Sequence, residues 1–411
     1  MFLKVKGIGK IQDSTVEMKG ITVIAGENNT GKSTFGKALF CMFNAFRNSD
    51  DSIHNARVND IRRIFRGTLP RFHNRLLGQN VIEDILSDHD ITQILGEVIK
   101  LYSSVNPKPD DNIVNILTET IKRSIMIDKQ EIHKTIITRC FKQEFSGRVN
   151  HLNKPNTSGN ISLEIKGKKI EVTIRANECS SFKDNIGLLN DAIYIDTPFI
   201  MDDVENFYGS GFVGPHNIVT HRDDLLERLI QKRSNNTVLE EVIFKQKINS
   251  LISNIHSVVD GEFKEDEENL FFAEKKLKKP LPLSSISTGV KMFLVVKRLL
   301  ELGEIKERDI LIFDEPEIHL HPDWQIKFAE ILILLQKEFD LTILLTTHSP
   351  YFLHAIEVYC DKYSLKDRLN CYLAESEGDI SGVRDVSASI DTIYRQLARP
   401  FQELEDALYG N

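Results

Sequence analysis

Hydrophobic and polar residues follow two periods along the chain, one typical of strands and one typical of helices. Residues 2–24 predict two short strands and a third that ends at a glycine-rich loop, and strict alternation on either side of Gly167 predicts a hairpin over 161–174. Further strand-like runs lie at 192–200, 262–264, 270–274, 310–313, 341–346 and 369–375. Helix-period runs lie at 34–46, 81–145, 223–258, 294–300 and 390–408. The mixture predicts an α/β fold.

The third strand runs directly into the most informative segment of the sequence. Residues 21–34 read Ile-Thr-Val-Ile-Ala-Gly-Glu-Asn-Asn-Thr-Gly-Lys-Ser-Thr, a β-branched run followed by a loop between Gly26 and Gly31. Glycines at this spacing let successive backbone N–H groups face phosphate oxygens, and a helix that starts near Lys32 adds its positive end. We therefore expect a phosphate-binding P-loop in which Lys32 reaches the β- and γ-phosphates and Ser33 ligates Mg²⁺.

Two later segments carry groups that would complete such a site. Residues 310–313 predict a buried strand that delivers Asp314 and Glu315 at its carboxyl end, where open α/β sheets bind their ligands. The first carboxylate would support Mg²⁺ and the second would polarise the attacking water. His348 follows another predicted strand and would hydrogen-bond the γ-phosphate. The alternative, that the carboxylates only cap a helix and the histidine is structural, is disfavoured by the P-loop in the same chain.

A second anion cradle is predicted at the start of the helix near residue 290. Ser287 and Gly289 lie two residues apart there, so a hydroxyl and backbone N–H groups would face an anion. The pattern is short, and a serine at this position can also simply cap the helix.

Composition sets the broad class of the protein. The chain has 411 residues, of which 41% are apolar and 27% are charged, and this suits one large domain with an insertion or two domains. The net charge of −8 argues against a surface that binds nucleic acid all over, although a local basic groove stays open. No apolar run approaches the ~20 residues of a membrane span, and the first residues lack a signal peptide. We expect a cytoplasmic protein with no membrane partner.

The cysteines support that expectation. They are widely scattered, odd in number and without metal-ligand spacing, so we expect reduced thiols; they are Cys41, Cys140, Cys179, Cys360 and Cys371.

An arginine-rich stretch lies at 57–75, with apolar residues between the arginines. It would form either a solvated helix face paired with nearby acids or a basic face for nucleic acid, a partner or the phosphates.

Taken together, four segments resemble the Walker A, signature, Walker B and switch-histidine motifs of the ABC-type ATPases. They are Gly26–Ser33, Ser287-Thr288-Gly289, the run 313–322 and Thr347-His348-Ser349-Pro350. The run 313–322, Phe-Asp-Glu-Pro-Glu-Ile-His-Leu-His-Pro, is similar in particular to the OLD-like branch, which is related to the SMC and RecF ATPases. The resemblance covers 1–46 and 280–360 well and the middle only in general plan.

The resemblance implies an ATPase that uses Mg²⁺ and closes two heads around two ATP molecules, as a homodimer or a higher oligomer. Lys32, Glu315 and His348 would be catalytic, as phosphate ligand, base and γ-phosphate sensor, and Ser33 and Asp314 would hold the metal. Ser287 and Gly289 would act on the ATP of a second subunit. The remaining ATP contacts would come from the P-loop, namely Gly26, Glu27, Asn28, Asn29, Thr30, Gly31, Lys32, Ser33 and Thr34.

The sequence departs from the family pattern at two places. The signature continues with Val290 where the family usually has Glu or Gln, and no glutamine marks the Q-loop, for which Asp196 is the nearest candidate. His319 and His321 lie in the turn after Walker B, where a structural or dimer-contact role is favoured over a metal site.

The domain plan follows from the motif positions. Residues 1–46 and 281–411 would form an ABC-type P-loop ATPase head with a mixed sheet flanked by helices. Residues 47–280 would form a large, mainly helical insertion containing the β-hairpin, an arm or partner-binding lobe that returns a strand to the head at about 190–200.

The resemblance also suggests a biological setting. Only 63 of the 411 residues follow His348, too few for the TOPRIM nuclease of OLD proteins. Standalone ATPases of this kind resemble the ATPase subunits of two-gene bacterial antiphage systems such as Septu and PARIS, which act with a separately encoded effector. The alternatives are a DNA-repair head of the RecF or SMC type and a transporter nucleotide-binding subunit.

Overall fold

The computed structural model describes residues 1–68, 111–208, 220–231, 251–266 and 269–409, together with Lys100 and Ile248. The chain forms two compact units. The first comprises Met1–Arg47, Thr138–Gly214 and Val219–Asn411, and the second comprises Asn48–Ile137 and Pro215–Ile218. Each is described here by itself.

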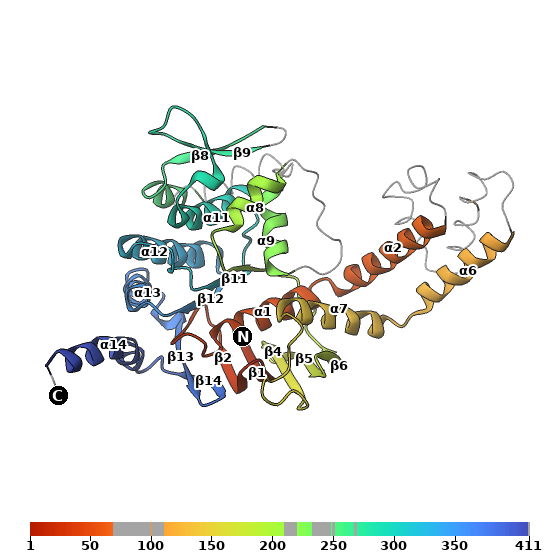
Figure 1. Ribbon diagram of the computed structural model, residues 1–411, viewed down its shortest axis with the longest axis horizontal. Helices are drawn as coiled ribbons and strands as arrows, with labels where there is room; N and C mark the ends of the chain where they lie inside the picture. Colours follow the sequence, from red (N-terminus) through yellow and green to blue (C-terminus); the bar gives the residue numbers. More distant parts are fainter. Residues whose placement is uncertain are drawn as a thin grey trace. The chain divides into compact units, whose positions relative to one another are not determined.

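The first unit is built on an eleven-stranded mixed sheet (Figure 1). Its strand order is β6-β5-β4-β1-β2-β14-β13-β3-β12-β11-β7. The strands span β1 Phe2–Ile8, β2 Ile11–Glu17, β3 Ile21–Gly26, β4 Gly159–Ile165, β5 Lys168–Arg175, β6 Glu178–Asp184, β7 Ala192–Ile195, β11 Ile310–Asp314, β12 Thr342–Thr347, β13 Leu369–Glu377 and β14 Ile380–Asp385. The α/β fold with a mixed sheet flanked by helices is confirmed.

The parallel part of this sheet runs from β13 through β3, β12 and β11 to β7. Every residue of β3 and β7 is buried, which explains their continuous apolar sequences. Strand β12 lies between β3 and β11, with Ala25 opposite Thr347 and Asp314 opposite Thr346. The carboxyl ends of three strands distant in sequence therefore meet at one edge.

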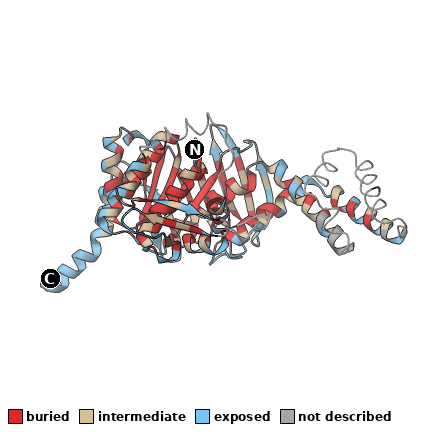
Figure 2. Ribbon diagram, turned by 90° about the horizontal axis from the view of Figure 1, so that it is seen from above, coloured by how far each residue is buried: buried red, intermediate tan, exposed pale blue. Residues whose placement is uncertain are grey.

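Helices cover both faces of the parallel strands. Leu311 and Phe313 of β11 belong to a core formed with α11 (Thr288–Leu302), α12 (Pro322–Phe339) and α13 (Pro350–Lys362). The side chain of Ile312, between them, approaches Gly36 of α1 (Lys32–Phe46). Because successive residues of a strand point to opposite faces, α1 covers one face and the α11–α13 group the other. Figure 2 shows the buried residues along these layers.

The other elements of this unit are shorter or peripheral. They are the helices α8 (Ile200–Phe207), α9 (His221–Ile230) and α14 (Asp391–Tyr409), the turns η1 (Leu283–Ser285) and η2 (Lys366–Arg368), and a three-stranded sheet of β10 (Leu281–Pro282), β9 (Leu270–Glu274) and β8 (Gly261–Glu265). Local sequence sets several boundaries. Thr220 and Asp223 form a capping box at α9, and Ser349 accepts the N–H of Phe352 at the start of α13.

The second unit is helical in its described part. It contains α2 (Ser49–Thr68), α6 (Asp111–Met126) and the first part of α7 (Lys129–Glu144). Apolar side chains of α2 and α6 are buried, and the Ser124 hydroxyl donates to Asp60 at 2.5 Å. Arg57 donates to the Ile127 carbonyl at 3.0 Å and Arg63 pairs with Asp60, so these two members of the arginine-rich stretch have partners within the unit.

The placement of the hairpin in the inserted arm is wrong. Strands β4 and β5 form the predicted hairpin, but β4 pairs antiparallel with β1 and extends the main sheet. The compact unit that begins near residue 48 ends at Ile137 rather than at 280, apart from 215–218. The reason is that the alternating pattern of 161–174 fixes a strand pair but does not say which free sheet edge it joins.

Several other predictions have partial outcomes. Helices α6 and α7 form within 81–145, and α9 begins at His221, two residues before the predicted run 223–258, and ends at Ile230. Residues 81–99, 101–110, 232–247 and 249–250, with Arg71 and Arg75, lie outside the described residues. No disulfide joins the five cysteines, and all five are buried. Within the part of the chain that the structure describes, no helix is long and apolar enough to cross a bilayer.

Candidate active site

The predicted P-loop connects β3 directly to α1. Two of its glycines are required by the backbone. Gly26 has φ of 155°, and a Cβ there would lie 2.5 Å from the carbonyl oxygen of Ala374. Gly31 has φ of 87°, and a Cβ there would lie 2.8 Å from Ile11 Cδ1. Asn29, with φ of 67°, is a third left-handed residue in the loop. The loop therefore turns tightly enough for α1 to begin at Lys32.

Lys32 extends back under the loop. Its Nζ donates to the carbonyl oxygens of Gly26 and Glu27, both at 2.9 Å, and lies 3.0 Å from Glu315 Oε1. The side chain is 3% exposed, and three oxygens match the three N–H bonds of its ammonium group. A buried ammonium is stable only when it is compensated in this way. The contact with Glu315 joins the first predicted motif to the third.

The end of β11 carries both predicted carboxylates. Asp314 accepts hydrogen bonds from the hydroxyls of Tyr194, at 2.9 Å, and Thr346. Glu315 has φ of 50°, a left-handed conformation that is rare for glutamate. The Thr346 carbonyl and hydroxyl oxygens hold this turn by accepting the Glu315 N–H at 3.1 and 3.0 Å. The strained turn directs Glu315 toward Lys32, away from the line of the strand.

His348 completes a chain of charges with Glu315. Its Nδ1 lies 3.5 Å from Glu315 Oε2. The pKa of Glu315 is lowered by His348, raised by burial and lowered again by Lys32, and it settles at about 2. The contact with Glu315 in turn raises the pKa of His348, against a smaller opposite effect of burial. Glu315 is therefore an anion at neutral pH, and it lies between Lys32 and His348.

Sequence reasoning missed Glu317, a buried carboxylate that contacts Thr347 and His348 at the end of β12. Its side chain is 2% exposed, and its Oε1 accepts the hydroxyl of Thr347 at 2.5 Å and the backbone N–H of His348 at 3.0 Å. Burial raises the pKa of Glu317, whereas the hydrogen bond from Thr347 lowers it by less. Its position in the Glu-Pro-Glu segment was visible in the sequence, but a carboxylate two residues after Glu315 gave no sign that it would point inward.

The predicted signature segment makes none of the contacts described for Lys32, Glu315 and His348. Ser287 is the N-cap residue of α11, but its exposed side chain makes no capping hydrogen bond. A Cβ on Gly289 would lie 2.9 Å from the His319 carbonyl and 3.0 Å from Trp324, so Gly289 packs against the turn after β11. Lys291 is buried and its Nζ contacts Asp202 at 2.5 Å.

The two histidines of that turn have local partners. The His319 ring packs edge-on against Phe199 with centroids 5.4 Å apart, and His321 Nδ1 accepts the N–H of Asp323 at the start of α12. Among the described residues, no group of three or more His, Cys, Asp or Glu side chains is arranged to hold a metal. The structural or dimer-contact role favoured for the pair stays a prediction.

Asp196, the candidate for the Q-loop position, follows β7. Its Oδ2 lies 2.7 Å from Arg222 and 3.2 Å from His221 Nε2. Burial alone would raise the pKa of Asp196, but His221 and Arg222 outweigh it and lower the pKa to about 2. The carboxylate is thus held by protein cations.

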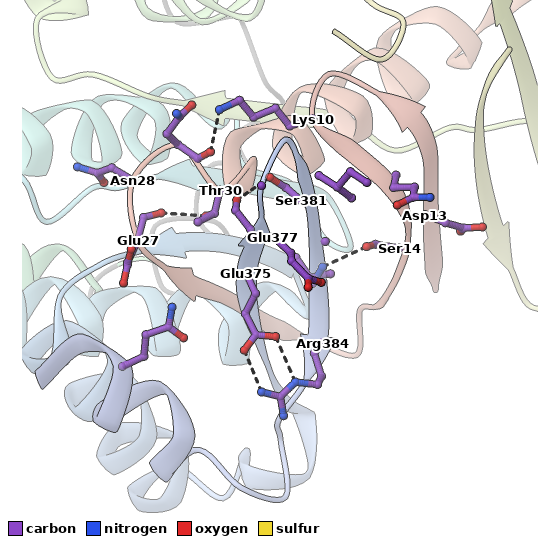
Figure 3. Close-up of a pocket in the computed structure, with 18 of the residues that line it drawn as sticks. Lys10, Asp13, Ser14, Glu27, Asn28, Thr30, Glu375, Glu377, Ser381 and Arg384 are labelled. Atoms are coloured by element: carbon purple, nitrogen blue, oxygen red, sulfur yellow. Dashed lines mark hydrogen bonds and ion pairs between the residues drawn. The ribbon is translucent and has the colours of Figure 1, made fainter. Parts of the chain in front are cut away.

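A cavity of about 780 Å³ opens beside the P-loop (Figure 3). Its walls come from the loop itself, from β2 and the β13–β14 turn, and from α14. Lys10 donates to the Asn29 carbonyl at 3.4 Å, Arg399 pairs with Glu27 at 3.2 Å, and Arg384 pairs with Glu375. The lining includes Glu27 to Thr30 of the loop, but Lys32, Ser33, Asp314, Glu315 and His348 do not line this cavity.

The residues present fit Mg²⁺ bound together with phosphates. The Asp314 carboxylate and the Ser33 hydroxyl are hard oxygen donors, which Mg²⁺ prefers. Mg²⁺ at such sites takes only one or two protein carboxylates and completes its shell with phosphate and water, so a cluster of three acidic side chains is not needed. The left-handed glycines and the helix start at Lys32 fit the phosphates themselves.

Comparison with known proteins gives one family match. The AAA ATPase domain model (AAA_15) matches residues 1–353 of the 411.

Solved structures similar to the chain include the SMC head domain from Thermotoga maritima, with 12% identity and a TM-score of 0.41 over 94% of this chain and 98% of that chain. The SmcHead bound to the C-winged helix domain of ScpA has 10% identity and a TM-score of 0.46 over 93% and 97%. The Smc head domain with an extended coiled coil, bound to the C-terminal domain of ScpA derived from Pyrococcus furiosus, has 11% identity and a TM-score of 0.42. The match covers 97% of this chain and 98% of that chain. At these values no function is transferred.

Proposed function

The chain belongs to the AAA ATPase domain family, and from this premise we propose that it binds Mg²⁺-ATP at the P-loop and hydrolyses it. The observation that carries the proposal is the contact between Lys32 and Glu315, which brings the phosphate-binding loop and the predicted base together although 283 positions separate them. His348, at the end of a third strand, lies on the other oxygen of the same carboxylate.

In the proposed mechanism Lys32 changes partners. In the structure its ammonium group lies 3.0 Å from Glu315 Oε1. Phosphate oxygens in the loop would compete with Glu315 for this ammonium, and its transfer to them would remove one of the two groups that lower the pKa of Glu315. The freed carboxylate then accepts a proton from the attacking water more readily. Nucleotide binding would thus activate the base.

Asp314 and Ser33 would hold Mg²⁺, which when bound neutralises charge on the β- and γ-phosphate oxygens. His348 would donate to the γ-phosphate from its place beside Glu315. The remaining P-loop residues, Gly26 to Thr34, would supply backbone N–H groups to the phosphates.

We further propose that ATP drives dimer formation, with Ser287 and Gly289 of one copy contacting ATP held by another. The exposed, uncapped hydroxyl of Ser287 supports this, because it is available to a second molecule. The resemblance of the 313–322 segment to the OLD-like branch supports a sensor or regulator ATPase of a bacterial antiphage system, acting with a separately encoded effector.

The experiment that tests this role is isolation of the native protein from its host, with and without ATP and Mg²⁺, beside a Lys32→Ala variant. A stoichiometric second protein that is released or activated on ATP turnover, and is unaffected by ATP in the variant, is the expected result. A dimer without a partner whose ATP turnover rises only with DNA would instead establish the RecF- or SMC-type head. Recovery with membranes would point to a transporter subunit.

A further inference from the structure

The orientation of Asp314 is set by two hydroxyl groups from neighbouring strands. Tyr194 of β7 donates to Oδ2 at 2.9 Å, and Thr346 of β12 donates to Oδ1. A carboxylate with one donor on each oxygen cannot rotate about its last bond without breaking a hydrogen bond. Each oxygen keeps a further lone-pair direction for another ligand.

Tyr194 is itself fixed on two sides. It is 1% exposed, and its ring lies against α1, where a Cβ on Gly36 would be 3.2 Å from both Cζ and the hydroxyl oxygen. The His221 ring stacks on it with centroids 4.3 Å apart and an interplanar angle of 25°. The hydroxyl therefore has little freedom to leave Asp314.

His221 is held in turn by two carboxylates. Its Nδ1 lies 2.6 Å from Glu144 Oε1, and its Nε2 lies 3.2 Å from Asp196 Oδ2. Glu144 also accepts the backbone N–H of His221 at 3.2 Å. Because both ring nitrogens face a carboxylate, the ring cannot flip or tilt away from Tyr194 without losing a contact.

We infer that Tyr194 is a positioning residue that holds Asp314 in the orientation that receives Mg²⁺, and that His221 keeps Tyr194 in place. The inference deepens the proposed function and rests on it. Phenylalanine would fill the same space beside α1 and His221, so the hydroxyl is the part of Tyr194 that packing does not explain. Its contact with Asp314 does.

The test is a Tyr194→Phe variant, with Tyr372→Phe as the matched control. Tyr372 is 3% exposed in the same sheet, and its hydroxyl accepts the backbone N–H of Glu17 at 2.8 Å, away from Asp314. Binding of a fluorescent ATP analogue is titrated with Mg²⁺ and repeated in EDTA. Outer-shell partners of metal ligands typically account for 10–100-fold in metal affinity. We expect Tyr194→Phe to raise the half-saturating Mg²⁺ concentration by about tenfold and to leave binding in EDTA unchanged.

The control separates positioning from a general structural role. Tyr372→Phe should leave the Mg²⁺ titration at the wild-type position, whatever it does to the melting temperature. A Tyr194→Phe protein with a wild-type Mg²⁺ titration, or with equal losses in Mg²⁺ and in EDTA, would overturn the inference while the ATPase proposal stands. If wild-type protein does not bind the analogue at all, the proposed function fails first.

A second substitution probes the same carboxylate from the other side. Thr346→Val should raise the Mg²⁺ requirement as Tyr194→Phe does, and Thr346→Ser, which keeps the hydroxyl, should restore it. A Thr346→Val protein with a wild-type Mg²⁺ requirement would contradict the role assigned to the two donors.

Discussion

The P-loop edge of the sheet and the signature segment differ in how their polar groups are satisfied. At the edge, Lys32, Glu315 and His348 contact one another, and Asp314 has two hydroxyl donors. At the signature, Ser287 is exposed and caps no N–H, although Lys291 four residues later is buried with Asp202. In one region charged groups of a single chain contact one another, and in the other an exposed serine makes no capping hydrogen bond.

The family resemblance implies both nucleotide binding and ATP-driven dimer formation, and the difference between the two regions lets these properties be tested separately. Nucleotide and metal binding should depend on the P-loop edge alone and should persist in an isolated chain. Turnover through a closed dimer should depend on both regions. Substitutions in each region therefore have different expected signatures.

The largest effect is expected at Lys32. Lys32→Ala removes the phosphate ligand and leaves Glu315 with one cation fewer, so ATP turnover should fall by about 10³-fold and binding of the nucleotide analogue should weaken as well. Lys142→Ala is the control, because this substitution also removes one lysine charge. Among the described residues Lys142 forms an ion pair with the exposed Glu178 and none with a predicted site residue. Equal turnover in the two variants would contradict the role of Lys32 as a phosphate ligand.

A smaller and more selective effect is expected at Ser287. Ser287→Arg places a bulky cation where a second molecule would approach, so turnover should fall by about 10²-fold. Binding of the analogue by one chain should not change. Light scattering should show that ATP no longer raises the molar mass. An unchanged ATP-dependent mass would contradict the contact between copies, and weakened binding would place Ser287 in the chain's own site.

The smallest effect concerns stability and pH. Burial lowers the pKa of His221, but Asp196 and Glu144 outweigh it and raise the pKa to about 9, against about 6.5 in an unfolded chain. The folded state therefore gains stability that is fully present below pH 6.5 and is lost as the pH rises through 9. The contribution is up to about 3 kcal/mol.

Urea unfolding between pH 6 and 10 measures this contribution. The midpoint of wild type should fall across that interval, whereas a His221→Asn variant should start lower and show a flatter profile. A wild-type profile that is flat between pH 6.5 and 9 would mean that His221 is neutral in the folded protein.

Sequence reasoning located the parts of the site that depend on local pattern. The P-loop, the carboxylates after β11 and His348 could be predicted because each follows a buried strand, and parallel strands bring their carboxyl ends to one edge. The contacts that orient these groups could not. Tyr194 and Thr346 read as ordinary strand residues, and their hydroxyls meet Asp314 only because β7 and β12 flank β11.

The largest error in the predicted fold, the placement of the hairpin, also arises because local sequence does not determine contacts between distant strands. The hairpin of β4 and β5 was recognisable from its alternation, but its attachment to β1 depends on pairs that lie 154 to 162 positions apart, from Lys6 with Asn160 to Phe2 with Glu164. Local periodicity defines a strand and its faces, and leaves open which edge the strand will join.

The central claim is that Glu315 is the base of an ATP-hydrolysing site, and steady-state turnover of Glu315→Gln with Mg²⁺ tests it most directly. Glutamine keeps the size of the side chain but cannot accept the proton, so turnover should fall by about 10²–10³-fold while the analogue still binds and the dimer with ATP persists. Turnover at the wild-type rate would contradict the account.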